Sequence, residues 1–91
     1  MNRETGWSLR PTPAFERELG RLDRGTQRRV IKELEAVLTS GDPRSQGKSL
    51  RGGLQGYWRY RVGDYRVIVE IKDRELCLVA IKVGHRSRIY R

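Results

Sequence analysis

The residues from 57 to 71, YWRYRVGDYRVIVEI, constrain the fold more than any other stretch of the chain. Large apolar residues alternate with arginines on both sides of a Gly-Asp pair. Alternation with a period of two sends successive side chains of a strand to opposite faces, and a short glycine-containing pair is typical of a hairpin turn. The stretch therefore predicts two antiparallel strands with one apolar face and one face that carries Arg59, Arg61 and Arg66.

The chain before this hairpin predicts a short strand at residues 7–10 and then two helices. Thr12 is a hydroxyl cap followed by proline at the first helical position, and apolar residues recur after it at helical spacing. A second amphipathic pattern runs from Thr26 to about Ser40 and ends at Gly41. Residues 41–56 are rich in glycine and predict a loop.

A nearly continuous apolar run, Leu76–Val83, follows a polar turn over residues 72–75 and predicts a largely buried last strand. The resulting order is β-α-α-β-β-β, an α+β domain in which a helical hairpin packs on one face of a small antiparallel sheet. A length of 91 residues suits one core, so we expect a single domain over residues 1–91. The arginine face of the sheet stays open.

The composition limits the possible functions. Twenty lysines and arginines against eleven acidic residues give a net charge of +9, which favours a polyanion or an acidic protein as partner. One histidine, one cysteine and scattered carboxylates offer no metal-ligand spacing, so we expect neither a metal nor another cofactor. We see no apolar run of membrane-spanning length and no signal peptide, and therefore expect a cytoplasmic protein without membrane association.

The hairpin arginines and the residues after the last strand form one candidate site: Arg59, Arg61, Arg66, His85, Arg86 and Tyr90. Metal-free RNA cleavage requires that the 2′-hydroxyl lose a proton, that the dianionic phosphorane be stabilised and that the 5′-oxygen be protonated. Arginines suit the second task, and an imidazole suits proton transfer near neutral pH. Tyr90 is a second candidate for proton transfer. The residues alone predict binding of nucleic acid or of an acidic partner.

Three motifs at these separations, KSLRG, RVGDYRV and VGHRSRIY, resemble the RelE branch of the RelE/ParE toxin superfamily of bacterial toxin–antitoxin modules. The resemblance extends from Trp7 to Tyr90. It implies a ribosome-dependent endoribonuclease that cuts mRNA in the ribosomal A site by attack of the 2′-hydroxyl. The family's catalytic positions fall on Arg59, Arg61, Arg66, Arg86 and Tyr90, and we assign RNA or ribosome contact to Lys48, Arg51 and Arg88.

Arginine is a poor proton acceptor, so the role expected at Arg61, where well-studied relatives have lysine, is charge stabilisation. His85, which many relatives share, becomes the first candidate for proton transfer. Since the sequence ends at Arg91, we expect no further C-terminal helix over the site.

The resemblance implies an acidic, RelB-like antitoxin as cognate partner, together with the ribosome and mRNA. Operator DNA would be contacted only through the antitoxin. Two alternatives remain on the same fold. One is a ParE-type poison of DNA gyrase, and the other is a non-enzymatic co-repressor that acts with its antitoxin.

Overall fold

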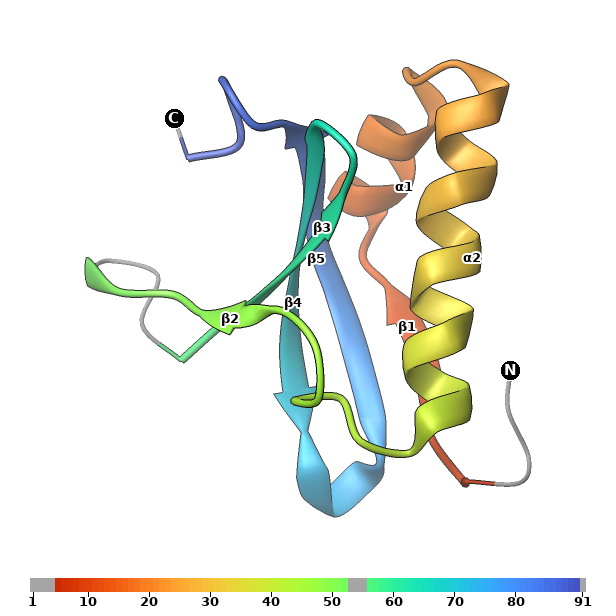
Figure 1. The fold of residues 1–91 in the computed structure, drawn as a ribbon, viewed down its shortest axis with the longest axis vertical. Coiled ribbons are helices and arrows are strands. Elements are labelled where there is room, and N and C mark those ends of the chain that lie inside the picture. The colour runs from red at the N-terminus through yellow and green to blue at the C-terminus, as the bar shows by residue number, and fades with distance from the viewer. Residues whose placement is uncertain (1–4, 53–55, 91) are drawn as a thin grey trace.

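The computed structural model describes residues 5–52 and 56–90. Two helices cover one face of a five-stranded sheet and leave the other face open (Figure 1). The predicted α+β architecture is therefore confirmed. In chain order the elements are β1 (Ser8–Pro11), α1 (Pro13–Gly20), α2 (Arg24–Ser40), β2 (Lys48–Ser49), β3 (Trp58–Val62), β4 (Tyr65–Lys72), a 3₁₀ turn (Asp73–Glu75) and β5 (Cys77–His85).

Side-chain caps fix where the two helices begin. The Thr12 hydroxyl accepts the backbone N–H of the third residue after it at 3.1 Å, as its sequence position predicts. Asp23 caps α2 by accepting the N–H of Thr26 at 3.1 Å and its hydroxyl at 2.6 Å, and these bonds lower the pKa of the Asp23 carboxyl. Because Asp23 supplies this cap, α2 begins before the predicted Thr26. It ends at Gly41, which has the left-handed φ of 70°.

The strands are arranged in the order β1-β5-β4-β3-β2. The β3–β4 and β4–β5 pairs are antiparallel, as predicted, but β1 runs parallel to β5 and pairs Ser8 with Cys77. The sheet is thus mixed where an antiparallel sheet was predicted, since β1 lies next to the last strand and the partner of an edge strand is not encoded locally. The predicted loop over residues 41–56 contains the two-residue strand β2, and its residues 53–55 lie outside the described part of the chain.

The core lies between the helices and the sheet. Its buried members come from both layers and include Phe15, Val30, Leu34, Tyr60, Val67 and Leu78. The Tyr60 hydroxyl donates to the Pro43 carbonyl at 2.6 Å, and burial raises its pKa. Trp58 Nε1 donates to the Gln46 carbonyl at 2.7 Å. These two bonds attach the segment before β2 to the edge of the sheet.

Side chains of α1 and of its cap, Thr12, form hydrogen bonds with backbone groups at a bulge in β5. The register between β4 and β5 shifts so that Ile81 is the extra residue. The Thr12 hydroxyl donates to the Ile81 carbonyl at 3.3 Å, and the Glu18 carboxylate accepts the N–H of Val83 at 3.0 Å. Polar backbone groups near the bulge are therefore satisfied by α1 and its cap, which holds this helix on β5.

A basic candidate active site on the open face of the sheet

Strand register places the hairpin cations on the open face. Arg61 pairs directly with Arg66 across β3 and β4, and Lys48 pairs with Arg59 across β2 and β3. Residues that pair directly share a face, and like charges in that position repel each other. The alternate residue Tyr60 is buried in the core, so these four cations point away from the helices.

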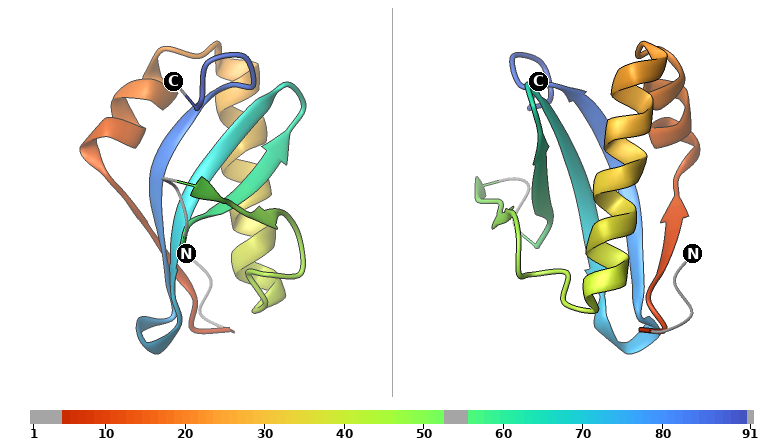
Figure 2. Two further views of the ribbon diagram at one scale, coloured as in Figure 1. Left: turned by 90° about the vertical axis from the view of Figure 1, so that its left-hand side faces the viewer. Right: turned by 45° about the vertical axis from the view of Figure 1, so that its right-hand side comes forward.

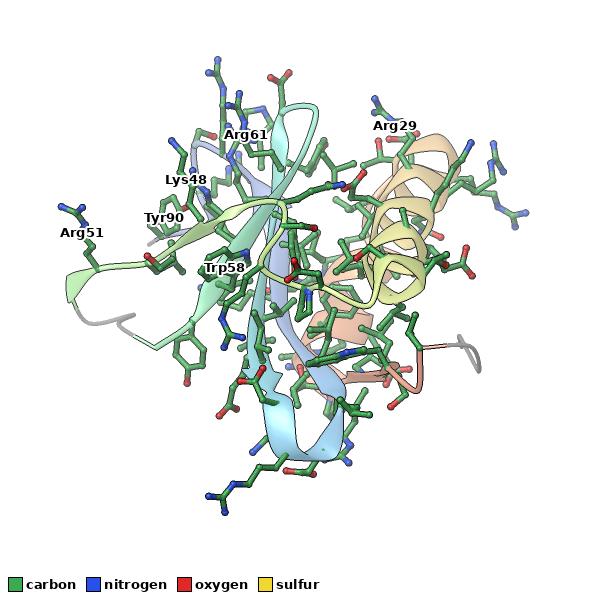
Figure 3. All side chains as sticks on the ribbon, turned by 60° about the horizontal axis from the view of Figure 1, so that its bottom comes forward. Arg29, Lys48, Arg51, Trp58, Arg61 and Tyr90 are labelled. Carbon is green, nitrogen blue, oxygen red and sulfur yellow. The ribbon has the colours of Figure 1, made fainter. Side chains whose placement is uncertain are left out.

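Side-chain positions agree with this register. Figure 3 shows Lys48, Arg61 and Tyr90 on the side of the sheet away from α2, which carries Arg29. At the β3 edge, Lys48 and Arg59 also line a cavity of about 200 Å³ that extends to Glu33 of α2. The open face is therefore a concentrated cationic surface with a phenol beside it.

Arg66 is a buried cation among other cations. Only 8% of the residue is exposed, and its Nη1 donates to the carbonyls of Gly63 at 3.0 Å and Tyr65 at 2.9 Å. Burial lowers the pKa of this guanidinium, and the charges of Arg61 and Arg59 lower it further. Among the described ion pairs, none joins a carboxylate to Arg66. A bound anion would relieve both the burial cost and the repulsion.

Arg59 has an unused donor. Its Nε is buried and has no hydrogen-bond partner, whereas its Nη1 donates to the Tyr90 hydroxyl oxygen at 3.3 Å. Buried donors without partners are rare in folded proteins and call for a physical explanation. An acceptor group arriving with a ligand would satisfy this one.

The residues after β5 fold back onto the same open face (Figures 1 and 2). Ile89 is only 3% exposed and anchors this segment, while Tyr90 remains 48% exposed. The Arg86 N–H donates to the Asp64 carbonyl at 2.8 Å, and its Nε lies 3.8 Å from the Asp64 carboxylate. The charge of Arg86 also acts on Arg66. The structure thus brings together five of the six predicted catalytic residues: Arg59, Arg61, Arg66, Arg86 and Tyr90.

His85 is the exception, because its ring lies on the helix-covered face. It pairs with Tyr65, and the two rings meet edge to face with centroids 5.5 Å apart. Together with Glu18 and Leu22 of the helical hairpin they line a cavity of about 570 Å³. The prediction ended the last strand at Val83, but β5 continues through His85. Strand alternation therefore applies to His85 and turns its ring away from the arginines.

The three residues predicted to contact RNA or the ribosome do not all lie together. Lys48 is paired with Arg59, and Arg51 is exposed and lines a surface depression with both of them. Arg88 instead lines the cavity that contains His85. Lys48 and Arg51 thus flank the arginines, whereas Arg88 does not.

Sequence reasoning missed the buried anchor Ile89 and the partner of Arg86, Asp64. An isolated apolar residue in the polar segment 86–90 was the available signal for Ile89. In residues 5–52 and 56–90, no three His, Cys, Asp or Glu side chains gather as a metal site would require. The helices in these residues are too short or too polar to cross a membrane.

The fold and this surface define a class: a small α+β protein whose open sheet face gathers arginines beside a C-terminal phenol. A family model described as "ParE toxin of type II toxin-antitoxin system, parDE" matches residues 9–90. Toxin RelG of Mycobacterium tuberculosis is 33% identical over 85 residues, which cover 93% of this chain and 97% of that protein. The chain belongs to the RelE/ParE family of type II toxin–antitoxin toxins.

Solved structures agree with this placement. A chain of the toxin–antitoxin complex RelBE2 from Mycobacterium tuberculosis superposes with a TM-score of 0.80 at 30% identity, covering 89% of this chain and 99% of that one. The RelB–RelE complex from Methanococcus jannaschii gives a TM-score of 0.68 at 22% identity, covering 89% and 94%. At that lower identity the likeness concerns the fold alone.

Proposed function

We propose that this toxin is an endoribonuclease that cleaves mRNA in the ribosomal A site. The observation that carries the proposal is the cation cluster around the buried guanidinium of Arg66, which includes Arg61 and the unpartnered Nε of Arg59. Folding this cluster without a counter-ion is costly, whereas a phosphorane with two negative charges would be held by it. Aimed guanidinium groups stabilise such a transition state without a metal.

The reaction divides between charge and proton transfer. The 2′-oxygen forms a bond to the adjacent phosphorus as the bond from phosphorus to the 5′-oxygen breaks, which leaves a cyclic phosphate and a 5′-hydroxyl. Arg61 and Arg66 stabilise the charge on the phosphoryl oxygens. Tyr90 accepts a hydrogen bond from Arg59, so its own hydroxyl hydrogen is free for the departing 5′-oxygen. The 2′-hydroxyl proton passes to water or to a ribosomal group.

Binding partners follow from the same surface. Lys48 and Arg51 are exposed beside the arginines and contact phosphates of the mRNA or of the ribosome. An acidic, RelB-like antitoxin neutralises this face, and operator DNA is contacted only through that antitoxin. The solved relatives that are toxin–antitoxin complexes support a partner of this kind. Co-purification with a small acidic protein encoded next to this gene tests the pairing.

Primer extension on translated messages tests the activity. The wild type is expected to cut within codons only when ribosomes are present. Tyr90→Phe keeps the ring but removes the proton donor, so its cleavage rate should fall by about 10²-fold or more. Arg66→Ala should abolish growth arrest while antitoxin binding persists.

Arg28→Ala is the matched control, because it removes the same charge from an exposed position on α2, away from the site. Cleavage by this variant should equal that of the wild type. If Arg66→Ala loses antitoxin binding but keeps its toxicity, the site is placed wrongly.

The alternative target is DNA gyrase, and the description of the matching family model as a ParE toxin favours it. A gyrase poison would give gyrase-linked double-strand breaks while cellular messages stay intact. That result on induction would refute the nuclease proposal. Tyr90→Phe would then have little effect, since no proton transfer is involved.

A further inference from the structure

His85 forms hydrogen bonds with three residues of the turn that follows it. The N–H of Ser87 donates to the His85 Nδ1 at 3.1 Å, and the Ser87 hydroxyl lies 2.8 Å from the same nitrogen. The His85 carbonyl accepts the N–H groups of Arg88 at 2.9 Å and Ile89 at 3.0 Å. Contacts from residues 87, 88 and 89 therefore converge on one residue at the end of β5.

The hydrogen bond from Ser87 determines which ring nitrogen of His85 carries the hydrogen. A backbone N–H can only donate, so the Nδ1 of His85 must be the unprotonated nitrogen and acts as an acceptor. The neutral ring then carries its hydrogen on Nε2. The edge-to-face contact with Tyr65 holds the ring plane, and Glu18, Arg21 and Arg88 line the cavity on that side. The ring therefore makes a structural contact to the turn from the face opposite the arginines.

The turn over residues 86–90 determines where Tyr90 lies. Ile89, whose N–H is bound by the His85 carbonyl, is buried on the open face, and the next residue reaches Arg59 with its hydroxyl oxygen 3.3 Å from Nη1. Loosening the turn at Ser87 would let this phenol move away from the arginines. We propose that His85 is a positioning residue whose Nδ1 acts as the acceptor that fixes the 86–90 turn and so places Tyr90 at Arg59.

The effect of His85 on cleavage rests on the proposed nuclease function, whereas the effect of His85 on the position of Tyr90 does not. The two parts can therefore be measured separately. One assay follows mRNA cleavage on ribosomes, and the other follows the turn itself in the purified toxin by NMR.

Three substitutions at His85 separate positioning from proton transfer. In His85→Asn the amide oxygen stands as many bonds from the backbone as Nδ1 does, and it can accept the N–H of Ser87. His85→Gln carries its amide one bond further out, where Nε2 was. His85→Phe keeps a ring against Tyr65 but has no acceptor.

We expect His85→Asn to cleave at nearly the wild-type rate, while His85→Gln and His85→Phe lose about five- to tenfold, as the loss of one hydrogen bond implies. By NMR, His85→Asn should keep the nuclear Overhauser contact between Tyr90 and Arg59, and the slow amide exchange of Ile89. His85→Phe should lose both. Ser87→Ala removes the hydroxyl, the shorter of the two contacts to Nδ1, and leaves the backbone N–H, so its losses should lie between those of His85→Asn and those of His85→Phe.

Two outcomes would overturn the positioning role. In one, His85→Asn is as inactive as His85→Phe although its turn is intact by NMR, which assigns proton transfer to the ring. In the other, His85→Phe keeps the Tyr90 contact, which shows that the acceptor does not hold the turn. If the wild type cuts no RNA and the NMR pattern nevertheless follows the acceptor, the nuclease proposal fails and the positioning role stands.

Discussion

Ile89→Ala should detach the C-terminal turn without unfolding the domain. Ile89 is 3% exposed, yet it lies outside the core cluster beneath the helices. Its Cδ1 is 3.4 Å from where a Cβ on Gly84 would stand, so it packs on the open face of β5. Removing the side chain beyond Cβ costs roughly 2.4 kcal/mol at about 0.8 kcal/mol per buried carbon, which is roughly a 50-fold change in an equilibrium constant.

This change should fall on the local equilibrium between the docked and the detached turn. Amide hydrogen exchange measures it: protection of Ile89 should fall roughly 50-fold, while protection of Val67 in the middle of β4 should stay as it is. Ile89→Val is the control and should lose about 0.5–1.5 kcal/mol. The cleavage rate should fall with the docked population, because Tyr90 leaves with the turn. Equal loss of protection at Val67 would show that Ile89 belongs to the main core, and unchanged protection at Ile89 would show that burial does not hold the turn.

Two further predictions concern the edges of the site and the fold. At Gly47, φ is +79° and an added Cβ would overlap the Arg59 carbonyl oxygen, so Gly47→Ala should free β2 and lower the Tm by roughly 5–10 °C. Gly52→Ala is its control, because Gly52 has a φ of +69° but open space around it, and equal losses in the two variants would refute the overlap. The Arg44 guanidinium donates to both carboxylate oxygens of Asp73, at 2.8 and 3.0 Å, and lowers the pKa of that carboxyl. The ion pair between Arg44 and Asp73 therefore stabilises the fold at pH values above the ordinary aspartate pKa. This stabilisation is lost as the pH falls through the lowered pKa of Asp73. In urea titrations, the free energy of unfolding of Asp73→Asn should fall less than that of the wild type as the pH is lowered through this range. The same fall in both proteins would refute the stabilising role of this ion pair.

Features that depend on neighbouring residues in the chain could be predicted from the sequence. Strand β3, Trp58–Val62, lies within the predicted stretch and ends at the predicted Gly-Asp turn, because alternation and the turn are both local signals. Helix α1 begins after Thr12 for the same reason, since a cap acts within one turn. The shared face of Arg61 and Arg66 follows from hairpin register alone.

Features that depend on residues far apart in the chain could not be predicted from the sequence. The parallel pairing of β1 is decided by β5, which lies at the other end of the chain. The face on which His85 lies depends on where β5 ends, and pairing with Tyr65 extends that strand past Gly84. The burial of Ile89 likewise requires the open face of the finished sheet. The fold therefore brings five of the six predicted residues onto the open face, and it places the sixth, His85, on the face that the helices cover.

The position of β5 between β1 and β4 has a consequence for how the protein is made. Until Cys77–His85 has been synthesised, β1 has no partner and α1 lacks the strand to which Glu18 is bonded. Contacts between residues so far apart in sequence form late and slowly. The segment that completes the sheet also leads directly into the turn that carries Tyr90. During translation, a growing chain of this topology therefore lacks its assembled arginine and tyrosine surface until β5 and the turn after it have been added.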